Sequence, residues 1–198
     1  MNNQIVAHND LKIRIEEGFF TTAKSNTLLE NFISKLPWES MIIKMFGRDT
    51  KIPRLQCWIG DEGCEYRYSG KQLNRQIWNQ DLTMIRKKIY KELKIDFNSV
   101  LANYYRDGKD SMGWHSDDEK ELGPNPTIAS ISFGSERDLV FRNKISKKTL
   151  TIPQTNGCLI LIDGETQKNW QHSIKKTQKI IGPRINLTFR NIIHKNNF

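Results

Sequence analysis

The sequence predicts an α+β protein in which an N-terminal α/β portion packs on an antiparallel β-sandwich or barrel. Residues 25–38 and 79–94 have the apolar spacing of amphipathic helices. From residue 98 onward, short segments rich in β-branched and aromatic residues alternate with turn-forming residues, as in antiparallel sheets. The 198 residues suffice for one domain, and no linker rich in Pro, Gly or Ser divides them.

The two predicted helices each have their own boundary signals. The first has candidate caps at residues 25–27 and ends at Pro37, and the second runs from near Asn79 to Lys94. We expect short extended pieces between the helices, around residues 41–46 and 54–60. The inward-facing residues are Leu28, Leu29, Phe32, Ile33 and Leu36 in the first helix, and Leu82, Ile85, Ile89 and Leu93 in the second.

The C-terminal half contains the predicted strands of the sandwich. They occupy residues 99–105, 127–134, 138–143, 157–163 and 184–193. Short strands with loops between them favour an antiparallel arrangement over a parallel α/β sheet. We therefore expect a single domain over residues 1–198, with an N-terminal extension over about 1–97 and a β core over about 98–194.

The composition bounds the partners and the compartment. Lys and Arg number 31 against 22 Asp and Glu, a net charge of +9, which favours a polyanion such as nucleic acid or an anionic membrane. A lysine-rich genome explains the same excess. The three cysteines form no CxxC pair, which is typical of a reducing compartment. The N-terminus is too polar for a signal peptide, so we expect a cytoplasmic or nuclear protein that is not secreted and does not enter a membrane.

The sharpest chemical feature is a histidine and an aspartate two residues apart, followed far downstream by a second histidine. Side chains at i and i+2 project from the same side of an extended segment, so His115 and Asp117 can bind one metal ion. His172 must then come from another strand. Two imidazoles and one carboxylate on one face of an octahedral metal suit Fe(II), because the opposite positions stay open for a chelating co-substrate and O₂. The triplet alone is a weak signal, since any exposed loop can contain one.

A row of polar residues on one predicted strand supports the metal site. In RINLTFR the alternate residues Arg184, Asn186, Thr188 and Arg190 share one face. Arginine pairs with carboxylates in a planar, bidentate manner, so this row fits a dicarboxylate. Asn103 and Tyr105 share a face of another predicted strand and offer further donors. The alternative is a solvated outer face with two ordinary surface arginines.

Several longer runs occur in a fixed order between about residues 46 and 193. They are NYYRDGKDSMGWHSDDE, IASISFGSERDLVFR, the WQHS around His172, and PRINLTFR. Together they resemble the AlkB family of 2-oxoglutarate-dependent nucleic-acid demethylases, and most closely its eukaryotic-type DNA-repair branch. The resemblance implies a double-stranded β-helix (jelly-roll) core with an N-terminal nucleotide-recognition portion.

The resemblance also implies cofactors and an activity. Fe(II) would be bound by His115, Asp117 and His172, and 2-oxoglutarate and O₂ would be co-substrates. The co-substrate contacts would be Asn103, Tyr105, Arg184, Thr188 and Arg190, with one arginine on each carboxylate and Arg184 on the distal one. The implied reaction is oxidative demethylation of bases such as 1-methyladenine and 3-methylcytosine, with release of formaldehyde, by a monomer that acts in the nucleus if the source is eukaryotic.

The substrate face is predicted from three segments. PRLQCWIGDEGCEYRYSG resembles the family's nucleotide-recognition lid, which gives Arg54, Tyr66, Tyr68 and Ser69 as base or backbone contacts. Asp118 and Glu119 would favour a cationic alkylated base. KMFGRD resembles a hairpin of the duplex-DNA branch, in which Phe46 would fill the gap left by the extruded base, followed by Gly47 and Arg48. Trp114, beside the first metal ligand, could reshape the pocket.

Three alternatives remain open on the sequence alone. An RNA demethylase, or an oxygenase that acts on protein or a small molecule, would need the same metal and co-substrate residues. A non-catalytic reader of modified nucleic acid would need neither the intact triad nor the arginine row. Packing of Tyr66 and Tyr68 on a half-buried strand, or of Phe46 in the core, would remove the substrate contacts.

Overall fold

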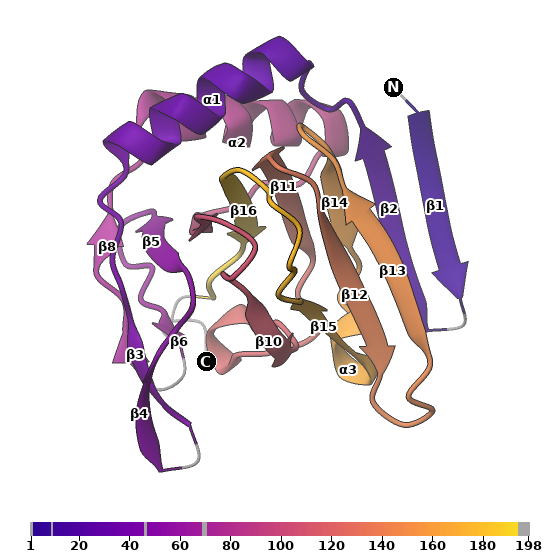
Figure 1. Cartoon of the computed structure of the whole chain (residues 1–198). Helices are drawn as coiled ribbons and strands as arrows, with labels where there is room; N and C mark the ends of the chain where they lie inside the picture. The colour runs from indigo at the N-terminus through magenta and orange to yellow at the C-terminus, as the bar shows by residue number, and fades with distance from the viewer. Residues whose placement is uncertain (1, 9, 46, 69–70, 194–198) are drawn as a thin grey trace.

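Two facing β-sheets form the centre of the molecule in the computed structural model (Figure 1). The structure describes residues 2–8, 10–45, 47–68 and 71–193. One sheet has eight strands in the order β1-β2-β14-β11-β16-β9-β5-β8, and the other has four in the order β10-β15-β12-β13. All neighbouring pairs are antiparallel except β5 and β8. The predicted α+β class with a jelly-roll core is confirmed.

The eight-stranded sheet combines strands from both halves of the chain. Its antiparallel strands bury alternate residues between the sheets and under the helices. The strands are β1 (Asn2–His8), β2 (Leu11–Glu17), β14 (Leu159–Ile162), β11 (Ile128–Gly134), β16 (Arg184–Arg190), β9 (Ser99–Tyr105), β5 (Leu55–Gly60) and β8 (Arg75–Gln76).

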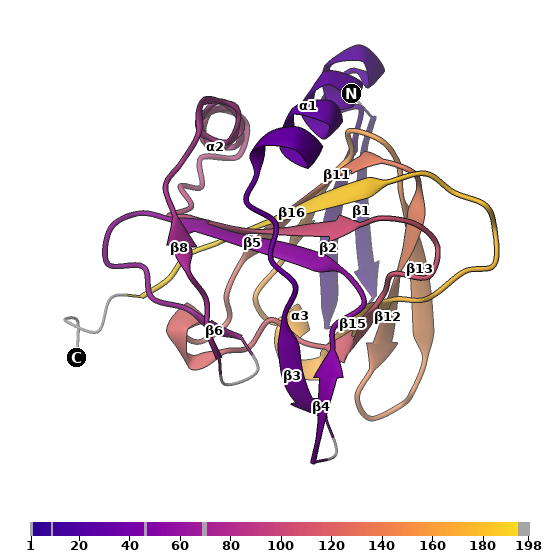
Figure 2. The ribbon, with the colours of Figure 1, turned by 60° about the vertical axis from the view of Figure 1, so that its left-hand side comes forward.

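The four-stranded sheet carries two of the three predicted metal ligands. Two short hairpins stand outside both large sheets, and Figure 2 shows one of them, β3–β4, projecting from the end of the molecule away from the helices. The four strands are β10 (Met112–His115), β15 (Trp170–Ile174), β12 (Arg137–Asn143) and β13 (Thr149–Gln154), and the hairpins are β3 (Ile42–Met45) with β4 (Arg48–Lys51) and β6 (Arg67–Tyr68) with β7 (Lys71–Gln72).

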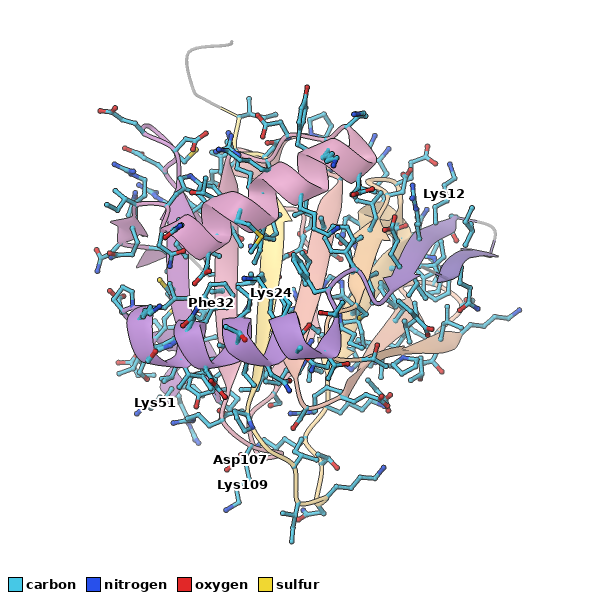
Figure 3. The ribbon with its side chains drawn as sticks, turned by 90° about the horizontal axis from the view of Figure 1, so that it is seen from above. Lys12, Lys24, Phe32, Lys51, Asp107 and Lys109 are labelled. Carbon is cyan, nitrogen blue, oxygen red and sulfur yellow. The ribbon has the colours of Figure 1, made fainter. Side chains whose placement is uncertain are left out.

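Helices α1 (Thr22–Lys35) and α2 (Gln80–Leu93) lie across the outer face of the eight-stranded sheet, as Figure 3 shows. The second helix begins where predicted, after Asn79, whose Oδ1 caps it by accepting a hydrogen bond from the Leu82 N–H at 2.9 Å. The first begins earlier than predicted, because the capping side chain is Thr21, which accepts from the Lys24 N–H. The predicted cap Ser25 is instead buried inside the helix.

Two further helical pieces are short, and both lie close to the predicted metal ligands. They are the 3₁₀ turn η1 (Lys120–Leu122) and α3 (Thr166–Asn169), which directly precedes β15. Among the described residues, no helix is long and apolar enough to cross a membrane.

The core has two principal layers of apolar side chains. One lies between the helices and the eight-stranded sheet and contains Phe32, Ile89 and Leu187. The other lies between the two sheets and contains Ile128, Phe141 and Trp170. The predicted inward stripes of both helices are confirmed by their burial or by their contact with the first layer. All three cysteines are buried and unpaired.

The N-terminal hairpin β1–β2 was not predicted. Its second strand alternates apolar and polar residues, with Leu11, Ile13 and Ile15 buried, which is the ordinary signal of a half-buried strand. It pairs with β14, and β5 pairs with β9. The eight-stranded sheet therefore continues across residue 98, where the sequence suggested that a recognition portion ends and a β core begins.

Candidate metal and co-substrate site

The three predicted metal ligands come together between the two sheets. The ligand atoms of His115, Asp117 and His172 all lie within 4.8 Å of one another. Asp117 and His172 are buried, and His115 is half-buried. Within the described part of the chain, this is the one group of His, Cys, Asp or Glu residues with the spacing of a metal site.

An irregularity in β10 brings the first histidine inward. Met112 lies opposite Ile174 and His115 lies opposite His172, but the register shifts between these two pairs. Residues three apart in a regular strand would face opposite sides, whereas here both Met112 and His115 line the cavity. Asp117 lies beyond the end of β10, so the prediction that one strand holds both ligands is wrong for Asp117.

The protonation of the triad suits metal binding. His115 Nδ1 donates to the Gly113 carbonyl oxygen at 2.9 Å, which leaves Nε2 as the ligand atom. Burial and the neighbouring His115 lower the pKa of His172 to about 3, so its imidazole is neutral. Burial raises the pKa of Asp117, but Arg190 and the two histidines outweigh it and lower that pKa to about 2. Neutral imidazoles and an ionised carboxylate are the states that bind metal.

The predicted polar row of β16 lies on the inner face of its strand. Its four members are buried, whereas Ile185, Leu187 and Phe189 belong to the core under the helices. The register with β9 places Tyr105 opposite Arg184 and Asn103 opposite Asn186. The cavity is lined by Asn103, Tyr105, Met112, His115, Asp117, Ile128, Ser130, Leu139, Gln154, Ile162, His172, Ile174, Asn186, Thr188 and Arg190.

The two arginines of the row differ in what they contact. Arg184 donates from Nη2 to Ser132 Oγ at 2.8 Å and to Gln154 Oε1 at 2.5 Å, but its Nε and Nη1 have no partner among the described residues. No carboxylate of the described chain pairs with this buried cation. Burying an unpaired charge is costly, so Arg184 fits an anionic ligand. The donor set therefore suits Fe(II) together with a carboxylate co-substrate.

Arg190 is instead committed to the metal site. Its Nη2 donates to Asp117 Oδ1 at 2.5 Å, and its Nη1 donates to the Tyr66 hydroxyl at 3.2 Å. Both guanidinium ends are therefore engaged by protein groups. The prediction that each arginine holds one carboxylate of the co-substrate fits the contacts of Arg184 better than those of Arg190.

Two predicted substrate residues turn inward. Arg54 is 3% exposed and donates from Nε to Asn103 Oδ1 at 2.9 Å, so it holds a predicted co-substrate contact rather than facing solvent. Tyr66 is 0% exposed, with its ring stacked on Trp58 at 4.5 Å and the Arg190 guanidinium over it at 5.5 Å. Both contradict an open, base-facing placement, because the resemblance locates a segment but not the direction of each side chain.

Three other predicted substrate residues cannot be placed. Phe46 and Ser69 lie outside the described residues, and of Tyr68 only the backbone, in β6, is described. The hairpin predicted around Phe46 is present as β3–β4. Gly47 has φ +77°, which fits a tight turn, and Arg48 is exposed on the second strand.

The two acidic residues after Asp117 have different surroundings. Asp118 is exposed and lies 3.7 Å from Lys144 Nζ. Glu119 is half-buried and accepts a hydrogen bond from the Tyr66 hydroxyl at 2.8 Å, while its Oε2 has no partner among the described residues. Burial raises the pKa of Glu119 above its ordinary value.

Trp114 does not narrow the cavity. It is not a lining residue, and its ring lies 4.1 Å from the guanidinium carbon of Arg142 and 6.0 Å from Lys175 Nζ. The suspected reshaping of the pocket is therefore wrong, because the shift in β10 turns His115 inward and leaves Trp114 outside.

Sequence reasoning missed several residues that build the cavity. Ser130 accepts a hydrogen bond from Asn186 Nδ2 at 2.8 Å, and Ser132 accepts from Arg184. The alternating serines of IASISFG were a usable signal for a polar inner face. Gln154 gave no such signal, because its partner Arg184 belongs to a distant segment.

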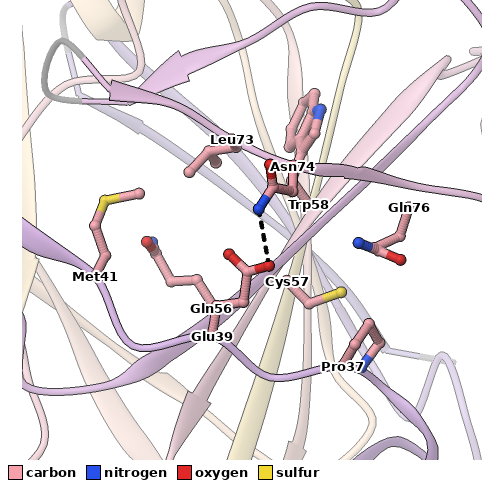
Figure 4. A pocket seen from close by; sticks show the side chains of 9 residues that line it. All are labelled: Pro37, Glu39, Met41, Gln56, Cys57, Trp58, Leu73, Asn74 and Gln76. Atoms are coloured by element: carbon pink, nitrogen blue, oxygen red, sulfur yellow. Dashed lines mark hydrogen bonds between the residues drawn. The ribbon is translucent and has the colours of Figure 1, made fainter.

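A smaller surface pit lies outside this site (Figure 4). In it, Asn74 Nδ2 donates to Glu39 Oε1 at 3.2 Å. The pit shares Gln56 with the network around Asn103 but contains no member of the metal triad. Its lining residues are Pro37, Glu39, Met41, Gln56, Cys57, Trp58, Leu73, Asn74 and Gln76.

Comparison with known proteins defines the class. The sequence profile of the 2OG-Fe(II) oxygenase superfamily matches residues 12–190, so the chain belongs to that superfamily. Membership implies Fe(II) as cofactor and 2-oxoglutarate and O₂ as co-substrates, as predicted. A solved structure titled "The structure of OsALKBH1" has the same fold, with a TM-score of 0.68 at 13% identity, covering 96% of this chain and 100% of that one.

The similar curated proteins are of AlkB type, which confirms the resemblance drawn from the sequence. "DNA oxidative demethylase ALKBH2" of Homo sapiens is 39% identical over 159 residues, which is 76% of this chain and 61% of that protein. "Alpha-ketoglutarate-dependent dioxygenase alkB homolog 3" of Mus musculus is 33% identical over 190 residues, which is 91% of this chain and 66% of that protein. The chain thus spans less than two thirds of the length of these relatives.

Proposed function

We propose that the chain removes N-methyl groups oxidatively from damaged DNA bases of the 1-methyladenine and 3-methylcytosine type. The observation that carries the proposal is one cavity lined by the triad and by Gln154, whose Oε1 accepts a hydrogen bond from Arg184, a buried cation that no described carboxylate neutralises. A metal with open positions next to an unpaired arginine fits a chelating dicarboxylate. The name of the ALKBH2 relative, a DNA oxidative demethylase, supports DNA as the substrate.

The protein's own residues bind and orient the reactants. His115 and His172 would ligate Fe(II) through ring nitrogens and Asp117 through its carboxylate. Arg184 would hold the distal carboxylate of 2-oxoglutarate, and Asn103, Tyr105, Thr188 and Arg190 would surround the rest. When bound, iron with 2-oxoglutarate and O₂ supplies the oxidation of the N-methyl group, whose hydroxymethyl product leaves as formaldehyde. Burial of the cavity excludes water from the reaction.

Glu119 supports a preference for alkylated bases. Methylation of a ring nitrogen makes the base cationic, and Glu119, two residues after Asp117, has a carboxylate oxygen to which no described residue donates. Asp118 adds a second negative charge at the surface nearby. Coulombic attraction to these two carboxylates would favour a cationic base over a neutral one. Tyr68 and Ser69 would contact the flipped base from the lid.

The β3–β4 hairpin supports duplex DNA as the preferred form. It projects from the molecule, and Gly47 in its turn has φ +77°; Phe46, which precedes Gly47 in the sequence, would fill the gap left by an extruded base. Arg48, exposed beside the turn, would contact the backbone. A DNA substrate places the activity in the nucleus of a eukaryotic cell, or in the cytoplasm otherwise. All the proposed ligands come from one chain, so a monomer suffices.

Formaldehyde release from three matched oligonucleotides tests the proposal. Single-stranded DNA, duplex DNA and RNA, each with one 1-methyladenine, are incubated with wild-type protein and with His115→Ala. We expect turnover of both DNA forms by the wild type and none by the variant. Strong turnover of RNA with none of duplex DNA would replace the repair assignment by an RNA demethylase. Succinate formation without turnover of any of the three would point to another substrate.

A further inference from the structure

The segment that carries Asp117 is not held by strand pairing. β10 and β15 pair at Met112 with Ile174 and at His115 with His172, and β10 ends at His115. The two histidines are therefore positioned by the sheet. Asp117 follows in a bend, so its position depends on other contacts.

A side chain from α3 holds the backbone of Asp117. Gln167 Oε1 accepts a hydrogen bond from the Asp117 backbone N–H at 2.9 Å. Both residues are buried, with Gln167 2% and Asp117 1% exposed. A buried N–H is costly to leave unpaired, so this bond fixes the peptide of residue 117, while Arg190 holds the carboxylate through Asp117 Oδ1.

Neighbouring contacts tie the same two segments together. Ser116 Oγ donates to the Trp170 carbonyl at 3.0 Å, and Lys144 Nζ donates to the Gln167 carbonyl at 2.9 Å. The helix itself is anchored to β2, because the Lys12 N–H donates to Thr166 Oγ1 at 3.1 Å. The loop with Asp117 and the strand with His172 are thus fixed to each other through residues 166–170.

From these contacts we infer that Gln167 is a positioning residue, which holds Asp117 in the geometry that binds the metal. Gln167 does not line the cavity and acts only through Asp117. Its Nε2 is buried without a partner in the described chain. Replacement by leucine would remove this unpaired donor while leaving the Asp117 N–H unpaired. We therefore expect Gln167→Leu to change the free energy of unfolding less than it changes the free energy of metal binding.

Cobalt binding to the full chain without co-substrate tests the inference. Co(II) suits nitrogen and oxygen ligands, and its visible absorption reports their geometry. We expect Gln167→Leu to weaken Co(II) binding by about 10–100-fold, as is usual for residues that orient a metal ligand, and to alter the spectrum. Gln171→Leu is the matched control, because Gln171 lies next to His172 but contacts Arg142 on the outer face. It should bind as the wild type does.

Wild-type affinity and spectrum in Gln167→Leu would overturn the inference, as would an equal loss in Gln171→Leu. Thermal unfolding of the metal-free forms separates this effect from misfolding. If Gln167→Leu does not fold, Gln167→Asn, which withdraws the acceptor by one methylene, must still weaken Co(II) binding. The inference rests on the proposed metal site. Absence of Co(II) binding by the wild type would refute that site and the inference together, whereas unchanged variants refute the inference alone.

Discussion

At the scale of single residues, the two arginines of β16 show how one row can serve two purposes. Arg190 neutralises Asp117, because its Nη2 donates to Asp117 Oδ1. Among the described residues Arg184 contacts only uncharged groups, which are the oxygens of Ser132 and Gln154 and the ring of Tyr105. Its charge is therefore uncompensated until an anion enters the cavity. Ligand binding and stability should be coupled through this residue.

Replacing Arg184 by leucine should leave the melting temperature of the ligand-free chain unchanged or raise it, since an unpaired buried charge is removed. The same variant should lose the stabilisation that 2-oxoglutarate gives the wild type, roughly 2.7 kcal/mol at a concentration of 100 times the Kd. Thermal unfolding with and without 2-oxoglutarate, at fixed Mn(II), measures both effects. Arg142→Leu, a change on the outer face, should keep the full stabilisation. A wild-type shift in Arg184→Leu would show that another group holds the anion.

At the scale of elements, β-branched and aromatic residues, with alternation where it occurs, made the strands predictable. The strand Ser99–Tyr105 matches its predicted segment, which is rich in β-branched and aromatic residues. The strand Arg184–Arg190, along which polar and apolar residues alternate, ends three residues before the predicted segment does. The shift in β10 could not be predicted from four residues without a clear period, yet it decides that His115 faces the cavity and Trp114 does not. Gln167 was missed for a related reason, since its contact joins segments far apart in the sequence.

The β3–β4 hairpin leads to a prediction on substrate form. Phe46→Ala should lower formaldehyde release from methylated duplex DNA about tenfold while changing single-stranded turnover little. Extruding a base from a duplex costs a few kcal/mol, which an inserted side chain offsets in part, whereas a single strand has no such gap to fill. A loss of about 1.4 kcal/mol of this compensation lowers the rate tenfold. Thr50→Ala, on the same hairpin, is the control. An equal loss on both substrates would assign Phe46 to packing instead.

The loop between β9 and β10 contains a carboxylate whose role depends on pH. Asp110 is buried and accepts hydrogen bonds from the Arg106 N–H, Nε and Nη2 at 2.7–2.9 Å. Burial raises the pKa of Asp110, but the contacts with Arg106 outweigh it and hold that pKa below its usual value. The folded state is therefore stabilised above about pH 4, where the unfolded carboxyl is ionised, and loses this contribution as the pH falls further.

Asp110→Asn should accordingly cost about 1–3 kcal/mol at pH 7, because the charged hydrogen bonds to Arg106 are weakened. That loss corresponds to roughly 2–4 °C of melting temperature per kcal/mol for a chain of this size. The difference from the wild type should shrink as the pH is lowered below 4, which thermal unfolding across pH can follow. Asp49→Asn, an exposed position on β4, should show no such trend. A constant difference at all pH values would mean that the ionisation of Asp110 does not stabilise the folded state.

At the scale of the whole molecule, the net charge of +9 bears on how substrate is captured. Contacts between Lys or Arg and phosphate release condensed counterions, so affinity falls as the salt concentration rises. The logarithm of the association constant falls linearly with the logarithm of the salt concentration, with a slope of about −0.9 per phosphate contact on duplex DNA and about −0.7 on a single strand. We expect oligonucleotide affinity to fall steeply between about 50 and 200 mM salt. Fluorescence anisotropy with catalytically silent Mn(II) measures the slope. An uncharged methylphosphonate strand with the same methylated base should bind with little salt dependence, since only contacts with the base remain. Equal slopes for the two strands would mean that the positive charge is not used for nucleic acid and reflects composition alone.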